Sequence, residues 1–207
     1  MVNSILITVV TVCFVILLSC TFSFMLARFP FKGSGILIGL FFVGMMIPVH
    51  CTLIPLYNMM NMAGLIDHLW ALLFPYVASS LPIAVFLTYG HYQQLPKELE
   101  EAARIDGCSV TGMFFRVFLP LSKPVISTIS ILTALSAWNE FMFANVFLSD
   151  PNQKTLPIGL LALKGTYSTD YAALCAALTM SAVPIILVYV LMSNKIQSGM
   201  VAGAVKS

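Results

Sequence analysis

Five long stretches of the chain are almost entirely apolar, and they determine its expected architecture. They cover residues 2–27, 36–57, 70–89, 125–148 and 171–194. Each is about as long as the roughly 20 residues that an α-helix needs to cross a bilayer. The runs are continuously apolar, whereas the strands of a membrane barrel alternate. Because backbone groups in lipid must be hydrogen-bonded within their own segment, the pattern predicts an all-α polytopic membrane helix bundle with five transmembrane helices, as one transmembrane domain of residues 1–207.

The composition agrees with a protein that lies in the lipid bilayer. Charged residues make up 9% of the 207 residues and hydrophobic residues 59%, against about 25% and 45–50% in soluble domains. A soluble domain could not cover its surface with so few charges. The composition therefore excludes an ordinary cytosolic enzyme, a disordered regulator and a protein that binds nucleic acid.

The basic residues predict how the helices are oriented. If the five spans alternate, eight of the ten Lys and Arg residues fall on one side of the membrane: Arg28, Lys32, Lys97, Arg104, Arg116, Lys123, Lys195 and Lys206. Only Lys154 and Lys164 fall on the other side. The positive-inside rule then places loop 91–124 and the C-terminus in the cytoplasm and the N-terminus outside.

The longest cytoplasmic loop, residues 91–124, has the pattern of two short helices around a glycine. Glu100 and Arg104 are spaced as an i,i+4 ion pair in the first helix. Gly107 suits the left-handed residue after a helix, and Ser109 suits the N-cap of the next one. The second helix has a bulky apolar face that contains Met113, Phe114, Val117 and Phe118. The loop is thus predicted to be a helix–Gly–helix hairpin.

The charge pattern and periodicity of this hairpin leave two interpretations open. An amphipathic hairpin can lie on the lipid headgroups of the membrane surface. It can also dock into a groove of a cytoplasmic partner protein.

The motif in this loop resembles a known family. Glu101-Ala102-Ala103, then Gly107, then Val117-x-Leu119-Pro120 is similar to the EAA loop of ABC importer permeases, with Val117 where Ile is most often found. In that family the hairpin is a coupling helix that seats in a cleft of an ATPase subunit. The resemblance implies that the ATPase-coupling residues are Glu101, Ala102, Ala103, Asp106, Gly107, Met113, Phe114, Phe118, Leu119 and Pro120.

Further motifs resemble the carbohydrate-uptake branch, specifically the maltose-type second permease. They are Trp138-Asn139-Glu140-Phe141, Ser149-Asp150-Pro151 and the C-terminal run from Gly199 to Lys206. The resemblance implies a multi-pass protein of a bacterial or archaeal cell membrane. Its implied partners are a cytoplasmic ATPase dimer, a second permease subunit and an extracytoplasmic sugar-binding protein. The family's first transmembrane helix has no counterpart here, so we expect a truncated product, an alternative start or an incomplete sequence.

The chain has no phosphate-binding motif of the G-x-x-x-x-G-K-[ST] type,. We therefore expect no cofactor in this chain and no enzymatic activity of its own, with ATP hydrolysis supplied by a partner subunit. An alternative function is a secondary carrier or channel subunit with a cytoplasmic regulatory hairpin. A carrier driven by ions would be expected to have several ionisable groups inside its spans, whereas Glu140 stands alone there.

The candidate substrate pathway is the group Trp138, Asn139 and Glu140. An ionisable residue inside a span is costly and usually faces protein or water, and a neighbouring Trp can stack on a sugar. The alternative, which the residues favour slightly, is that Asn139 and Glu140 tie helices together. The outward loop 155–171 is the expected place of contact with the binding protein.

Overall fold

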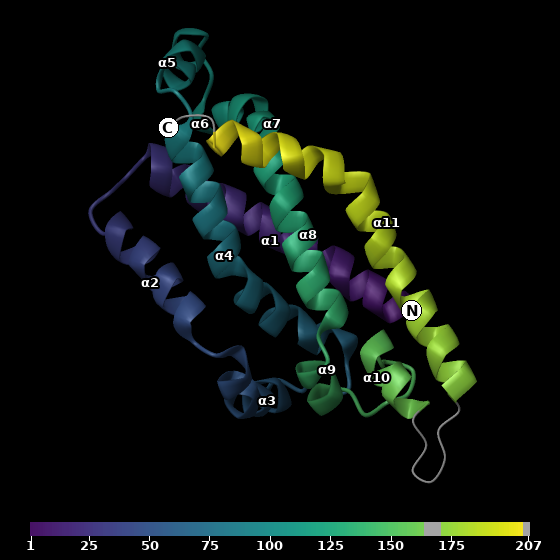
Figure 1. The fold of residues 1–207 in the computed structure, drawn as a ribbon. Coiled ribbons are helices and arrows are strands. Elements are labelled where there is room, and N and C mark those ends of the chain that lie inside the picture. Colours follow the sequence, from purple (N-terminus) through teal and green to yellow (C-terminus); the bar gives the residue numbers. More distant parts are fainter. Residues whose placement is uncertain (164–170, 205–207) are drawn as a thin grey trace.

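The computed structural model describes residues 1–163 and 171–204, with side chains omitted for residues 162, 188, 189 and 191–204. All regular elements in these residues are helices. The long ones are α1 (Val2–Arg28), α2 (Ser34–Met46), α4 (Leu73–Gln94), α8 (Lys123–Asn139) and α11 (Tyr171–Ala204). They run between two ends of the molecule (Figure 1). Residues 164–170 of the expected outward loop lie outside the described residues.

Shorter helices gather at the two ends. The helices α5 (Glu98–Ile105), α6 (Val110–Met113) and α7 (Leu119–Leu121) lie at one end, and α3 (Leu53–Met62), α9 (Met142–Phe147) and α10 (Leu156–Ala162) lie at the other (Figure 1). The single turns η1 (Val49–Thr52) and η2 (Leu69–Leu72) lead into α3 and α4, and a π-helical turn, η3 (Phe114–Phe118), joins α6 to α7.

Two helical segments among the described residues are long and apolar enough to cross a membrane, Val2–Arg28 and Leu69–Gln94. The number rises to four if two bent pairs each count as one span: Ser34–Met46 with Val49–Met62, bent by 95°, and Val110–Leu121 with Lys123–Asn139, bent by 74°. The predicted helical membrane class is confirmed. The count of five spans stays a prediction, and the apolar segment Tyr171–Leu187 is the first part of the longer helix α11.

Two of the predicted spans are interrupted. The segment 36–57 breaks at Ile47, whose backbone is extended (φ −79°, ψ 119°). The residue before a proline avoids the helical region, and Pro48 follows directly. The segment 125–148 also departs from one continuous helix: α8 ends at Asn139, Glu140 is extended (ψ 127°), and α9 starts at Met142.

Small polar residues let α1 pack closely against its neighbours. Thr11, Ser19 and Ser23 on α1 are buried, and the Ser23 hydroxyl donates a hydrogen bond to the backbone oxygen of Val85 on α4 at 3.1 Å. Small side chains of this kind are typical of helix interfaces in membranes. Helix α2 is different, because it has no buried residues and packs mainly against α4, with one ring contact between Phe41 and Phe22 of α1.

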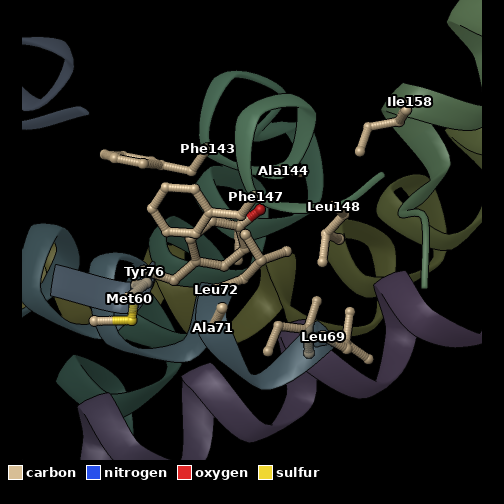
Figure 2. Close-up of a cluster of buried hydrophobic side chains, with 12 residues drawn as sticks. Met60, Leu69, Ala71, Leu72, Tyr76, Phe143, Ala144, Phe147, Leu148 and Ile158 are labelled. Carbon is tan, nitrogen blue, oxygen red and sulfur yellow. The ribbon is translucent and has the colours of Figure 1, made fainter. Parts of the chain in front are cut away.

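The end of the molecule that carries α3, α9 and α10 has its own apolar core. Phe143 and Phe147 of α9 lie over Leu72 and Tyr76 near the start of α4 (Figure 2). The two phenyl rings of α9 are 5.7 Å apart and T-shaped. This core, to which Met60 of α3 and Ile158 of α10 also belong, fixes the short helices to the first turns of α4.

Candidate functional site

The predicted hairpin is present, and its glycine turn has the expected geometry. Gly107 has φ +73°, a conformation that favours glycine,. Its N–H donates to Arg104 at 3.0 Å, and the N–H of Cys108 donates to Ala103 at 2.9 Å, which is the Schellman pattern of a helix end,. The Ser109 hydroxyl accepts from the N–H of Gly112 at 3.1 Å, so it caps α6 as predicted,.

The base of the hairpin is held to the long helices by a buried aromatic group. We call this group the aromatic anchor: Phe24 of α1, Tyr92 of α4, and Phe114 and Phe118 of the hairpin. The Phe24 ring lies 5.0 Å from that of Phe118 and 5.2 Å from that of Phe114, and Tyr92 lies 5.8 Å from Phe118. Phe118 and Tyr92 are fully buried. Rings at these separations attract one another beyond their area of contact.

Arg28 joins the same three parts of the chain through polar contacts. Its Nη2 donates to the backbone oxygens of Tyr92 at 2.5 Å and Leu95 at 2.6 Å, at the end of α4. Its guanidinium carbon lies 4.9 Å from the centre of the Phe118 ring. Carbonyls at a helix end lack internal partners and attract a cation. Arg28 therefore ties the ends of α1 and α4 to the hairpin.

The structure divides the predicted ATPase-coupling residues into two groups. Four are buried inside the chain: Ala103, Met113, Phe114 and Phe118, none more than 7% exposed. Leu119 is half-buried, and the others are exposed: Glu101, Ala102, Asp106, Gly107 and Pro120. The bulky apolar face of the second helix thus points toward α1 and α4 and not toward solvent.

Ile105 is a further exposed residue that the sequence interpretation missed. It is 87% exposed at the last position of α5, while Ala103, two residues earlier, is 4% exposed. The sequence could have indicated this exposure, because two residues along a helix turn a side chain to nearly the opposite side from Ala103. Val110 (45% exposed) and Phe115 (55% exposed) add apolar surface to the second arm of the hairpin.

The three residues of the candidate substrate pathway point to different surroundings. Trp138 is buried and its Nε1 donates to the backbone oxygen of Ser181 on α11 at 3.3 Å. Asn139 is exposed, and its Nδ2 donates to Leu135 of its own helix at 2.9 Å. Only Glu140 turns toward α4. The structure therefore does not bring the three side chains together.

Glu140 ties α4 to α9. Its Oε2 accepts from the Tyr76 hydroxyl at 2.8 Å and from the N–H of Ala144 at 3.2 Å, and its Oε1 accepts from the N–H of Phe143 at 2.8 Å. A carboxylate at the start of a helix satisfies N–H groups that have no partner in the helix. These contacts give the physical reason for the break after Asn139.

Glu140 also forms part of the wall of a polar cavity of about 250 Å³. The cavity lies between the break that follows α2, the first half of α4 and the end of α8. The residues that line it are Val49, His50, Tyr76, Ser79, Ser80, Ser136, Ala137, Glu140 and Phe143. The sequence interpretation found Glu140 but not the serines, because single serines in an apolar span give no distinct signal.

At the end opposite the hairpin, backbone groups of segment 149–156 are held by polar side chains. Asn3 Nδ2 donates to the backbone oxygens of Asn152 at 2.8 Å and Lys154 at 3.1 Å, and the N–H of Leu156 donates to the Ser4 hydroxyl at 2.7 Å. The start of α1 thereby positions the first part of the expected outward loop.

Comparisons with known proteins agree with these features. The family model described as "binding-protein-dependent transport system inner membrane component" matches residues 19–196. The probable ABC transporter permease protein YurM of Bacillus subtilis (strain 168) is 41% identical over 204 residues, which are 99% of this chain and 68% of YurM. The arabinooligosaccharides transport system permease protein AraQ of Halalkalibacterium halodurans is 36% identical over 204 residues, covering 99% of this chain and 72% of AraQ.

The fold is also similar to that of a solved transporter. A chain in the crystal structure of a bacterial ABC transporter that imports the acidic polysaccharide alginate matches with a TM-score of 0.82 and 23% identity. The match covers 93% of this chain and 72% of the other. At this identity the likeness concerns the fold.

Proposed function

The chain belongs to the family of binding-protein-dependent transport system inner membrane components, and from this membership we propose that it serves as the permease subunit of an ABC importer for a sugar or oligosaccharide. Its relatives carry names such as ABC transporter permease and arabinooligosaccharides transport system permease. The resemblance read from the EAA loop is confirmed by these matches. They do not favour the alternative of a secondary carrier or channel subunit.

The observation that carries the coupling mechanism is the exposure of Ile105. Ile105 does not stand alone, because Val110 and Phe115 are also exposed on the same anchored hairpin, and exposed apolar groups that gather on one surface mark interaction sites. Ala102, Asp106 and Gly107 are exposed around the same turn. We infer that this turn docks in a groove of the ATPase, as amphipathic helices do. The buried residues Met113, Phe114 and Phe118 hold the hairpin in place from the inside.

The proposed assembly contains a cytoplasmic ATPase dimer, a second permease subunit and an extracytoplasmic sugar-binding protein. ATP is hydrolysed in the ATPase, and this chain provides half of the translocation pathway. The aromatic anchor links the docked hairpin to the ends of α1 and α4, so a movement of the ATPase would be transmitted to both helices. Alternating access by rocking of helix bundles is the expected outcome.

We propose that the hairpin end is cytoplasmic and the N-terminus outside. The described basic residues on or beside α5–α8, together with Arg28 at the end of α1, support this orientation under the positive-inside rule,. The end of α8 with Trp138, Asn139 and Glu140 then lies in the outer half of the protein. The outward loop 155–171 would face the sugar-binding protein.

The test is ATP hydrolysis by the purified complex reconstituted in liposomes. Binding protein loaded with a transported sugar should stimulate hydrolysis, and a panel of neutral and acidic sugars identifies the substrate. Ile105→Asp should abolish co-purification of the ATPase, because a carboxylate does not enter an apolar groove without a large desolvation cost. Met62→Asp is the matched control, since Met62 is 89% exposed at the other end of the molecule. Retention of the ATPase by Ile105→Asp would refute the docking assignment.

A further inference from the structure

The polar cavity beside Glu140 is unusual in a bundle of otherwise apolar helices. It lies between α4, α8 and the turn after α2, is partly open to the surface, and measures about 250 Å³. Pockets that hold drug-sized ligands measure about 300–1,000 Å³, so this cavity is large enough for one small ring. Six of its lining residues have polar side chains: His50, Tyr76, Ser79, Ser80, Ser136 and Glu140.

Two hydroxyl groups in this cavity have no protein partner. Serines of α8 elsewhere donate back to their own helix, as Ser127 does to Lys123 at 2.9 Å and Ser130 to Ile126 at 2.7 Å. No hydrogen bond joins the hydroxyl of Ser80 or Ser136 to any other residue that the structure describes, although Ser80 is only 7% exposed. Ser136 is exposed, and both serines line the cavity, so their hydroxyl groups are available to a polar occupant that can donate and accept hydrogen bonds.

Glu140 is the acidic residue among the described residues that line the cavity. The three donors to Glu140 are the Tyr76 hydroxyl and the N–H groups of Phe143 and Ala144, all of them neutral. No Lys or Arg is among the lining residues. A negative charge in a confined site repels anions and attracts cations.

We propose that this cavity is a subsite for one neutral sugar ring on its way through the importer, and that Glu140 disfavours acidic sugars. Ser80 and Ser136 bind the hydroxyl groups of the ring, and His50 offers a further donor or acceptor at the rim. This inference rests on the proposed function, because it assigns the contacts of a sugar that the importer must carry.

The test labels a cysteine in the cavity with small charged reagents. Ser136→Cys is introduced into the assembled importer after replacement of the native cysteines, and its reaction with 2-(trimethylammonio)ethyl and 2-sulfonatoethyl methanethiosulfonate is compared. Each rate is divided by the rate of the same reagent with free cysteine in solution, because a cationic reagent is intrinsically faster with a thiolate. After this normalisation the rate of the cationic reagent should be about tenfold higher, as expected for steering by a nearby carboxylate. Ser130→Cys, whose parent hydroxyl bonds its own helix, is the control and should react slowly with both. A transported neutral sugar, added with its binding protein and ATP, should slow the labelling of Ser136→Cys.

Glu140→Gln in the Ser136→Cys background should bring the two rates together. If Glu140→Gln fails to fold, the test uses the protein with Glu140 intact. The ratio of the cationic to the anionic labelling rate should then decrease at high ionic strength, because salt screens the carboxylate. Equal rates, no labelling, or labelling that a transported sugar leaves unchanged would overturn the subsite. The proposed function fails by a separate result, which is the absence of ATPase stimulation by any sugar-loaded binding protein in the unmodified importer.

Discussion

Asp67 is a single residue on which the loops at the outer end of the molecule depend. It is the only residue other than glycine with positive φ (64°) among those the structure describes. Its Oδ1 accepts from the N–H groups of Ser149 and Asp150, the second at 3.1 Å, and its own N–H donates to Phe147 at 2.9 Å. Aspartate tolerates the left-handed conformation better than most residues. Through these hydrogen bonds Asp67 connects the turn before α4 to the segment after α9.

The hydrogen bonds of Asp67 predict a pH dependence of stability. The backbone N–H of Ser149, and then that of Asp150, lowers the pKa of the Asp67 carboxyl. A lowered pKa stabilises the fold at pH values above the unfolded pKa of about 3.9, and this contribution is lost as the pH falls through the folded value. In detergent at pH 7, the midpoint of thermal unfolding should decrease in the order wild type, Asp67→Asn, Asp67→Ala.

The advantage of wild type over Asp67→Asn should shrink as the pH falls from about 4 through the lowered folded pKa of Asp67, below which the aspartate is neutral in both states. Asp67→Ala should remain the least stable at every pH, since it loses the acceptor and fits the positive φ poorly. An Asp67→Asn protein that matches wild type at pH 7 would show that the charge of Asp67 contributes nothing.

The structural roles of single residues were easier to predict in the hairpin than at Asp67. Gly107 follows the first predicted helix of the hairpin and Ser109 precedes the second. The structure confirms the left-handed conformation of Gly107 and the cap formed by Ser109. Asp67 follows Ile66 and carries no such signal, because its role depends on Ser149 and Asp150, which are distant in the sequence. A pattern along the chain cannot reveal which remote N–H groups a carboxylate will meet.

At the scale of elements, the hairpin was predicted correctly but the role of its apolar face was not fully specified. Periodicity shows that Met113, Phe114 and Phe118 share one face, and it cannot show which neighbour covers that face. The structure covers it with Phe24 and Tyr92. What remains exposed for a partner is the turn around Ile105, together with Val110 and Phe115 on the second arm.

Arg28 connects these elements, and its removal should uncouple them. Arg28→Met removes two charge-assisted hydrogen bonds and the contact with Phe118, so we expect a loss of about 2 kcal/mol in the free energy of unfolding. Binding-protein-stimulated ATP hydrolysis should fall severalfold while the ATPase still co-purifies, because Ile105 is unchanged. Arg28→Lys should be intermediate, since an ammonium group lacks the planar fork of the guanidinium. Lys32→Met is the control with the same loss of charge at an exposed position. Full stimulation in Arg28→Met would exclude Arg28 from the transmission of movement.

At the scale of the whole molecule, composition predicted the membrane class but not the breaks in the helices. Segments 36–57 and 125–148 are mainly apolar, yet each is interrupted. Pro48 marked the first break in the sequence, and its restriction of Ile47 is local. The second break depends on Glu140, whose carboxylate caps α9 and binds Tyr76 of another helix. Hydropathy measures how apolar a segment is and does not register such a long-range contact.

The proposed orientation makes a prediction about the two ends of the molecule. Ile105 and Met62 are 87% and 89% exposed, and the helical segment Leu69–Gln94, long enough to span a membrane, separates them in the chain. In a background without the native cysteines, an impermeant thiol reagent should label Met62→Cys in sealed right-side-out vesicles and Ile105→Cys only in inside-out vesicles. The ATPase should protect Ile105→Cys and leave Met62→Cys reactive. The reverse pattern of labelling would contradict the positive-inside assignment, and labelling of both cysteines from one side would show that α4 does not cross the bilayer.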